Sequence, residues 1–179
     1  MTPSTTNELR HFGTLAPARE HLIQVYADVR ADLLHLPNYA VSAFTERLDR
    51  HGAEPGFAAV LAYEQGEPIG YAYANTITSS DRWWKRITPG PADEYTAPGA
   101  VALKEIGVRV PWRGTGTARH IHDALLSDRT EPHVTLMVNP AAGDGKVHRL
   151  YETWGYRDIG HSQPSPESPG LAAMIRATR

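Results

Sequence analysis

The sequence contains no cysteine among its 179 residues. This absence excludes disulfide bridges, thiolate metal sites and cysteine nucleophiles from the chemistry of the protein. If the chemistry needs a thiol, a cofactor or cosubstrate must supply it.

Long apolar runs and an excess of positive charge are also missing. No apolar run reaches the length of about 18 residues that predicts a membrane span. Lysine and arginine together number 18, against 20 aspartates and glutamates, so the chain lacks the bulk positive field of many nucleic-acid-binding proteins. We therefore expect neither a membrane nor a nucleic acid as partner.

The composition is that of an ordinary soluble domain. Hydrophobic residues make up 41% of the chain and charged residues 21%. A chain of 179 residues suits one domain, which we place at residues 1–179. Residues 1–7 lack the charged start and apolar core of a secretion signal, so we expect a cytoplasmic protein. A homodimer stays open beside a monomer.

Hydrophobic periodicity predicts a mixed order of helices and strands. The expected strands are residues 9–15, 57–63, 69–77, 101–110, 134–138 and 171–177, and helices are expected after Pro17, over residues 42–51, after the glycines at 114 and 116, and up to Tyr151. Residues 79–100 and 162–170 are expected as long irregular connections. This pattern alone supports only an α/β or α+β class.

The most informative segment is a strand, a glycine turn and a helix at residues 101–126. The turn has the sequence Arg-Gly-Thr-Gly-Thr-Ala at residues 113–118, which lets several backbone N–H groups point one way at the start of a helix. Such a helix start carries partial positive charge and binds anions. The segment therefore predicts a phosphate cradle.

Side chains around this turn support the same reading. Arg109 and Arg113 add full positive charges, although a solvated surface position is the alternative for Arg113. The following helix is expected to bury Ala118, Ile121 and Leu125, which have the spacing of a packed face.

Two common glycine motifs do not fit this turn. The P-loop is excluded because no lysine follows the glycines and the loop is too short. The dinucleotide fingerprint fails because Gly114 and Gly116 are not followed by the third small residue at its required place. The pattern that fits is Arg-x-x-Gly-x-Ala at Arg113, Gly116 and Ala118. It resembles the pyrophosphate-binding motif of the GNAT (Gcn5-related N-acetyltransferase) superfamily.

A second motif follows at the distance that this family requires. A strand at residues 134–138 leads to Asn139-Pro140, and a helix then ends in Leu150-Tyr151-Glu152-Thr153-Trp154-Gly155-Tyr156. This ending resembles the family's Leu-Tyr-Glu-x-x-Gly-Phe/Tyr. The order and spacing of the two motifs carry the resemblance, which covers residues 57–160 best.

The resemblance implies a fold and a cosubstrate. The fold would be the mixed α/β GNAT fold, a mostly antiparallel mixed sheet flanked by helices in which the fourth and fifth strands splay apart. Acetyl-coenzyme A would lie on the glycine turn and along the fourth strand. The implied cofactor-binding residues are Val108, Arg109, Val110, Arg113, Gly114, Thr115, Gly116, Thr117, Ala118, Asn139 and Lys146.

The resemblance also implies catalytic residues. Tyr151 matches the family tyrosine that protonates the departing sulfur, and its alternative role is a buried aromatic that only donates a hydrogen bond. Glu105 lies where several relatives carry a glutamate that accepts the amine proton, and its alternative is an ordinary carboxylate near a strand start. Asp81, Asp93 and Glu94 are rival candidates for the base or for a cation receptor.

One departure from the family pattern lies before the tyrosine. Many relatives have an asparagine seven residues earlier, whereas this chain has Asp144 in the glycine-containing loop at residues 141–145. Asn139 is expected to contact the pantetheine arm. Lys146 and Arg149 are expected either to reach the nucleotide phosphates or to lie on a solvated helix face.

Other aromatic residues and two histidines are candidate ligand-binding groups. Trp83 and Trp84 either wall an acceptor pocket or pack as a flap on the core. The resemblance places Tyr39 at the acceptor site, because in the family the first two helices help to shape that site. His120 and His122 lie two apart on an expected helix, so they face different directions and cannot share one ion. We therefore expect no metal.

The function predicted from the sequence is acetyl transfer from acetyl-coenzyme A to a primary amine of a small molecule, without a covalent acyl-enzyme. The alternatives are a coenzyme A-binding sensor without turnover, a protein N-terminal or lysine acetyltransferase, and a structural protein that binds ATP or NAD.

Overall fold

The computed structural model describes residues 7–166 and 168–179. The inference about a secretion signal concerns mainly residues 1–6, which lie outside the described residues. Residue contacts divide the chain into two compact units. Unit 1 contains Met1–Asn75 and Glu105–Asp128, and unit 2 contains Thr76–Lys104 and Arg129–Arg179.

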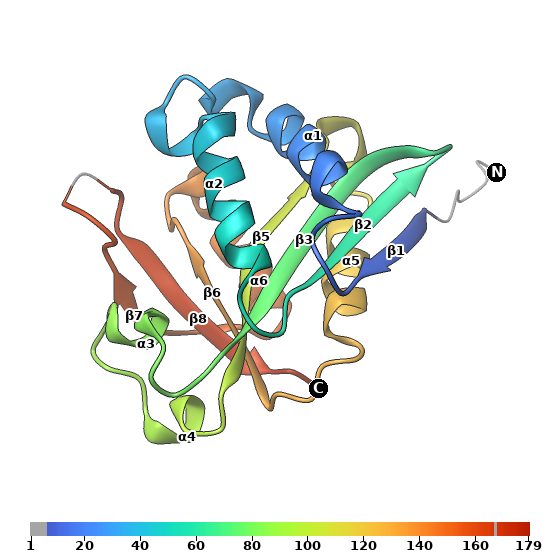
Figure 1. Ribbon diagram of the computed structural model, residues 1–179. Coiled ribbons are helices and arrows are strands. Elements are labelled where there is room, and N and C mark those ends of the chain that lie inside the picture. The colour runs from blue at the N-terminus through green and yellow to red at the C-terminus, as the bar shows by residue number, and fades with distance from the viewer. Residues whose placement is uncertain (1–6, 167) are drawn as a thin grey trace. The chain divides into compact units, whose positions relative to one another are not determined.

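Strands and helices alternate along the chain, as Figure 1 shows. The strands are β1 (Glu8–Phe12), β2 (Ala58–Glu64), β3 (Glu67–Ile77), β4 (Ile87–Thr88), β5 (Ala100–Val108), β6 (His133–Val138), β7 (Arg157–Ser162) and β8 (Leu171–Ala177). The α-helices are α1 (Arg19–Val29), α2 (Val41–Gly52), α3 (Arg82–Lys85), α4 (Asp93–Thr96), α5 (Thr117–Leu126) and α6 (Lys146–Thr153). Four short 3-10 segments are η1 (Ala31–Leu33), η2 (Pro37–Tyr39), η3 (Val110–Trp112) and η4 (Ala142–Gly145).

The strands form a mixed sheet in the order β1-β2-β3-β5-β6-β8-β7-β4. The β5–β6 ladder is parallel, and the ladders of β1–β2, β2–β3, β6–β8, β7–β8 and β4–β7 are antiparallel. The predicted fold class, a mostly antiparallel mixed sheet flanked by helices, is confirmed. The strands expected as fourth and fifth are β5 and β6, because the short β4 was not predicted.

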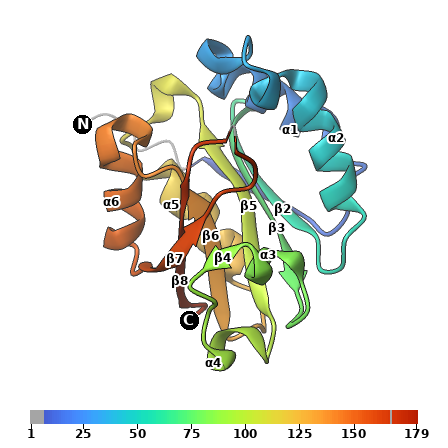
Figure 2. The same cartoon turned by 90° about the vertical axis from the view of Figure 1, so that its left-hand side faces the viewer.

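Unit 1 packs helices on both faces of β1, β2 and β3. In Figures 1 and 2, α1 and α2 cover one face and α5 lies on the other. Strand alternation explains this division. Tyr71 faces α2, where its ring meets Phe44 edge to face with 6.5 Å between centroids. The preceding residue, Gly70, faces α5, where an added Cβ would lie 2.8 Å from Ile121.

Helix α5 buries a slightly different set of residues from the one expected. Ile121 and Leu125 are buried, as the spacing predicts, but Ala118 is only partly buried. Thr117 and His122 are buried in addition. The expectation for Ala118 was wrong because the helix begins at Thr117, and this first residue turns its side chain inward.

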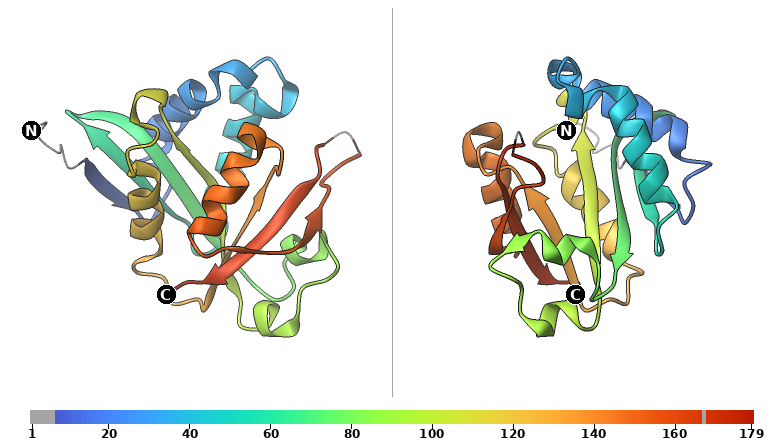
Figure 3. Two further views of the ribbon diagram at one scale, coloured as in Figure 1. Left: turned by 180° about the vertical axis from the view of Figure 1, so that it is seen from behind. Right: turned by 60° about the vertical axis from the view of Figure 1, so that its left-hand side comes forward.

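Unit 2 also has helices on both faces of its strands, and Figure 3 shows α6 along one of them. Arg176 of β8 faces α6, where its guanidinium Nη1 donates to the Trp154 carbonyl at 2.8 Å. Ala173 and Ile175, one residue to either side of Met174 on β8, belong to a buried cluster with Trp84 and Tyr95. That cluster holds the connection between β3 and β5 against the opposite face.

The expectation of an irregular connection at residues 79–100 was wrong. The segment contains α3, β4 and α4, and its side chains anchor it to unit 2. The Asp81 carboxylate accepts from the Trp83 backbone N–H at 2.9 Å and caps α3, while the Trp84 indole donates to the Thr78 carbonyl at 3.1 Å. An N-cap aspartate before two tryptophans was the signal, although helices of four residues are too short for periodicity to reveal.

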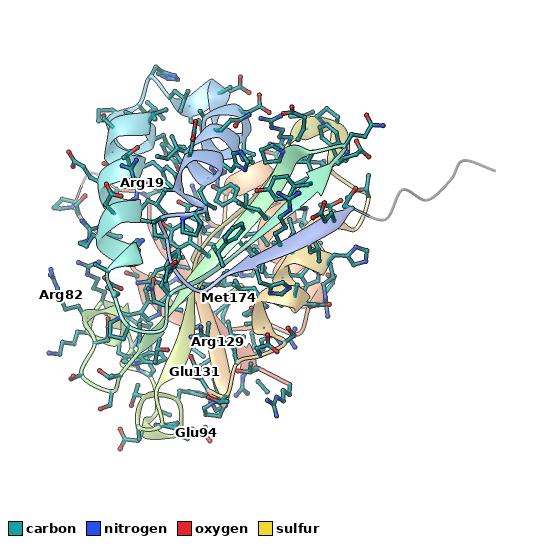
Figure 4. The ribbon with its side chains drawn as sticks, turned by 45° about the vertical axis from the view of Figure 1, so that its right-hand side comes forward. Arg19, Arg82, Glu94, Arg129, Glu131 and Met174 are labelled. Carbon is teal, nitrogen blue, oxygen red and sulfur yellow. The ribbon has the colours of Figure 1, made fainter. Side chains whose placement is uncertain are left out.

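A partly buried polar cluster closes one end of unit 2. Figure 4 labels Arg129 and Glu131, whose side chains form an ion pair. The Glu131 carboxylate also accepts from the Thr76 hydroxyl at 3.0 Å. These bonds tie the start of unit 2 to the segment that precedes β6.

Candidate functional site

The glycine turn before α5 has the conformation that an anion cradle requires. Gly114 and Gly116 have φ of 75° and 85°, in the left-handed region that favours glycine. A Cβ added at either position would meet no atom within 4 Å, so the space beside both glycines is open. Across residues 7–166 and 168–179, no side chain caps α5. Its first N–H groups also have no carbonyl one turn back, which leaves donors for a ligand.

Hydroxyl groups order this turn from within. Thr115 Oγ1 donates to the Trp112 carbonyl and lies 2.8 Å from Thr117 Oγ1. The Asn7 side-chain amide donates to the same Thr117 oxygen at 3.1 Å. The turn is therefore held in shape before any ligand arrives, which lowers the cost of binding.

The two predicted arginines have different surroundings. Arg109 Nε lies 3.2 Å from the Asp28 carboxylate, and the Arg109 backbone N–H donates to the Ile69 carbonyl at 2.9 Å. Arg113 Nε donates to the Val108 carbonyl at 3.0 Å, and its Nη2 lies 3.5 Å from the Val29 carbonyl at the end of α1. The Arg113 guanidinium therefore hydrogen-bonds the protein backbone. To bind a phosphate as predicted, it would have to use its remaining N–H groups.

Strands β5 and β6 separate after a short ladder. They pair at Val101 with Val134 and at Ala102 with Thr135. Within unit 2, β5 continues through Lys104 and β6 through Val138, and these remaining residues do not pair with each other. Within unit 2, Leu103 and Lys104 of β5 are thus left without a β6 partner, as the splayed strands of the predicted fold require. An extended ligand with amide groups can pair with such an edge.

Glu105 on β5 sits in a polar cluster of unit 1. Its carboxylate accepts from the Tyr71 hydroxyl at 3.4 Å and lies 3.7 Å from Arg30 Nη2. Its side chain is 18% exposed. Burial raises the pKa of the Glu105 carboxyl, while the nearby Arg30 and Arg47 oppose that rise. A carboxyl with a raised pKa is a better proton acceptor near neutral pH than an ordinary glutamate.

Tyr151 is buried on α6 among aromatic rings. Its ring meets Trp154 at 5.5 Å and Tyr156 at 5.7 Å between centroids, both edge to face. The Tyr151 carbonyl accepts from the backbone N–H groups of both residues, which end the helix. The motif Leu-Tyr-Glu-x-x-Gly-Tyr therefore fixes the tyrosine ring through its own aromatic residues.

Asn139 and Lys146 lie at either end of the loop between β6 and α6. The Asn139 side-chain oxygen accepts from the Ala141 backbone N–H at 3.0 Å, so the residue first serves to shape the loop. Lys146 is exposed at the first position of α6. Asp144 has φ of 57°, which is uncommon for a residue other than glycine, and its carbonyl accepts from Arg149 at 3.3 Å.

The predicted acceptor residues fall in both units. Trp83 is partly buried beneath Lys104, whose ammonium lies 4.9 Å from the ring centroid, and Trp84 is buried in the core of unit 2. Tyr39 is partly exposed in unit 1, and its carbonyl accepts from the Tyr26 hydroxyl at 2.8 Å. Trp84 therefore has the packing role that was its alternative.

The rival carboxylates have simpler surroundings. Asp81 caps α3, as described above. Asp93 and Glu94 are exposed in the first turn of α4, where negative charge suits the helix dipole. In the described parts of the chain, no group of three histidine, aspartate or glutamate side chains could hold a metal ion.

Arg30 and Tyr71 were not predicted as site residues. Both touch Glu105, from 75 and 34 positions earlier in the chain. No motif surrounds either residue, so only the packing of α1 and β3 against β5 brings them to the carboxylate.

Among the described helices, none is both long and apolar enough to cross a membrane.

Comparisons with known proteins agree with this structure. No family model matches the sequence. Two curated relatives, the aminoglycoside N(6')-acetyltransferases type 1 of Klebsiella pneumoniae and Serratia marcescens, are 26% identical over 122 residues. The match covers 66% of this chain and 56% of each relative, so the chain spans about half the length of the curated relatives it matches.

Solved structures match nearly the whole chain. A GNAT-family acetyltransferase from Streptococcus agalactiae has a TM-score of 0.68 at 11% identity, with 94% of this chain and 95% of that one covered. The ribosomal-protein-S18-alanine N-acetyltransferase of Escherichia coli has a TM-score of 0.64 at 12% identity, with 96% and 94% covered. The predicted GNAT fold is thereby confirmed, and at these identities the structural likeness shows the fold alone.

Proposed function

We propose that this chain, which has the GNAT fold, transfers an acetyl group from acetyl-coenzyme A to a primary amine of a small molecule. The observation that carries the proposal is the open glycine turn at Gly114 and Gly116, at the uncapped start of α5. Backbone donors there suit a pyrophosphate. The free edge of β5 beyond Ala102 suits the amide groups of pantetheine.

Different residues of the proposed site would bind different parts of acetyl-coenzyme A. The N–H groups from Gly114 to Ala118 would hold the pyrophosphate, with Arg109 as a neighbouring positive charge. The backbone of Val108 and Val110 would meet the pantetheine arm. Asn139 and Lys146 would contact the cosubstrate from the loop before α6.

Proton transfer would use two side chains that the family resemblance assigns. Glu105 takes a proton from the acceptor ammonium, which leaves a neutral amine able to attack the thioester carbonyl. A carbon–nitrogen bond forms and the carbon–sulfur bond breaks. Tyr151 Oη gives its proton to the departing sulfur and regains one from the new amide nitrogen. Glu105 then returns its proton to solvent.

A protein acceptor is the second candidate. It is favoured by the solved ribosomal-protein-S18-alanine N-acetyltransferase, whose structure covers almost all of this chain. The small-molecule acceptor is favoured by the aminoglycoside acetyltransferases among the curated relatives.

The first test compares thermal stabilisation by acetyl-coenzyme A, ATP and NAD. A ligand at 100 times its dissociation constant adds about 2.7 kcal/mol to the folded state, which is easily seen in a melting curve. We expect stabilisation by acetyl-coenzyme A alone, followed by thiol release when amines are added. Stabilisation by ATP or NAD instead would contradict the cradle. Binding without thiol release for any amine or peptide would indicate a sensor.

A further inference from the structure

The surroundings of Glu105 combine one carboxylate with two arginines. Arg30, directly after α1, lies 3.7 Å from Glu105. Arg47 on α2 donates to the Asn38 carbonyl at 2.9 Å, and its positive charge opposes the rise that burial causes in the pKa of Tyr26. The Tyr71 hydroxyl donates to the Glu105 carboxylate at 3.4 Å. All of these residues belong to unit 1.

Solvent reaches this cluster in spite of its partial burial. The Arg30 side chain is 33% exposed and that of Glu105 is 18% exposed. Tyr39, predicted to bind the acceptor, is partly exposed, and its backbone carbonyl accepts from the Tyr26 hydroxyl. A small molecule can therefore meet the carboxylate and at least one guanidinium together.

Of the four other acids on these two helices, Asp28 and Asp49 are paired elsewhere, and Glu20 and Glu46 are exposed. Asp28 of α1 pairs with Arg109 at 3.2 Å, and Asp49 of α2 pairs with Arg19 at 2.7 Å. With Glu105 ionised, the cluster keeps one positive charge in excess. Once Glu105 has accepted a proton, it keeps two.

This charge balance acts on any incoming ammonium group. An acceptor with only positive charges meets net repulsion in a partly buried site, where charges are weakly screened. An acceptor that also carries an anion can give that anion to a guanidinium, which binds carboxylates and phosphates through paired hydrogen bonds. It also draws Arg30 away from Glu105, which makes the carboxylate a stronger base.

We infer that the acceptor is an amine that also carries an anionic group, a carboxylate or a phosphate, held by Arg30 and Arg47 while Glu105 takes the amine proton. This inference rests on the proposed acetyl transfer. It separates the chain from enzymes that act on polycationic amines such as aminoglycosides.

The test uses matched amines with acetyl-coenzyme A and follows thiol release. L-amino acids and dipeptides with a free carboxylate are compared with their carboxamides, O-phosphoethanolamine with ethanolamine, and kanamycin serves as the polycation. We expect kcat/KM for the anionic member of at least one pair to exceed that of its neutral partner by about tenfold or more, the effect of one lost charged hydrogen-bond partner. The pair that shows this difference identifies the anionic group of the acceptor as a carboxylate or a phosphate.

Variants connect this preference to the two arginines. Arg47→Gln and Arg30→Gln should each reduce the ratio toward one, mainly through KM for the anionic amine. Arg50→Gln, the same change at an exposed residue three positions along α2, should leave the ratio unchanged. Circular dichroism and the acetyl-coenzyme A melting shift check that each variant folds and binds.

Two results would overturn the inference while leaving the proposed function intact. They are equal or better turnover of carboxamides or kanamycin, and an anion preference that survives both arginine substitutions. Turnover of none of these amines although acetyl-coenzyme A binds would overturn the inference and would also indicate a sensor. The absence of any melting shift with acetyl-coenzyme A would instead remove the proposed function itself.

Discussion

Gly116 before α5 and Gly145 before α6 have nearly the same backbone conformation, with φ and ψ of 85° and −2° at Gly116 and of 84° and 0° at Gly145. Each is the N-cap of its helix and follows a second left-handed glycine two residues earlier. Their surroundings differ. A Cβ at Gly116 would meet no atom within 4 Å, whereas one at Gly145 would lie 2.8 Å from Arg149 Nη1.

The difference separates backbone conformation from function. Both turns present the start of a helix, but the turn before α6 is filled by the chain's own arginine, which bonds the Asp144 carbonyl. The turn before α5 has space for a ligand. A glycine pattern therefore predicts the conformation of a turn, and the side chains around it decide whether an anion can enter.

The largest expected effect comes from filling the open turn. Gly116→Asp places a negative charge where the pyrophosphate would lie, and we expect the melting shift with acetyl-coenzyme A to disappear. Gly116→Asn is the matched control, because asparagine has the same size and also tolerates a positive φ. It should keep part of the shift. Unchanged affinity in Gly116→Asp would contradict the cradle.

The second-largest expected effect concerns Tyr151 on α6, the helix that begins after Gly145. Tyr151→Phe should lower kcat by about 10²-fold, the usual loss when a general acid is removed, and should leave the melting shift with acetyl-coenzyme A nearly unchanged. The measurement is thiol release at saturating amine. If the variant keeps full activity, Tyr151 has only the packing role that its contacts with Trp154 and Tyr156 already provide.

A smaller effect compares alanine at the two turns. Any residue with a Cβ at a left-handed position costs about 1–3 kcal/mol, so Gly114→Ala and Gly145→Ala should both lower the melting temperature. Gly145→Ala should lower it further, because its Cβ also displaces Arg149. Only Gly114→Ala should also weaken binding of acetyl-coenzyme A. Equal melting temperatures for the two variants would show that Arg149 moves without cost.

Local pattern predicted much of the fold and the cradle. Glycines 114 and 116 indicated the turn, and helical or alternating spacing located α1, α2, β2, β3 and β8 to within a few residues. Local pattern did not predict contacts between residues that lie far apart in the sequence. Nothing near Arg30 signals its approach to Glu105, 75 positions later, because that contact depends on how α1 packs against β5. Arg113 was predicted by its place in a motif, but its bonds to the carbonyls of Val108 and Val29 depend on where β5 and α1 end.

The smallest effect concerns how α6 is anchored. His148 on α6 lies 2.8 Å from Asp158 of β7 and 2.9 Å from Glu152 on its own helix. The hydrogen bond with Asp158, helped by the charges of both carboxylates, raises the pKa of His148 above its ordinary value of 6.5. The protonated histidine therefore stabilises the fold fully below pH 6.5, and this contribution is lost as the pH rises through the higher folded pKa. We expect His148→Gln to lower the melting temperature more at pH 6 than at pH 9, with Asp158→Asn showing the same trend. A difference that stays constant with pH would mean that the three side chains pack together without the ion pairs. The turn before α5 is held instead by the hydrogen bonds of Thr115, Thr117 and Asn7.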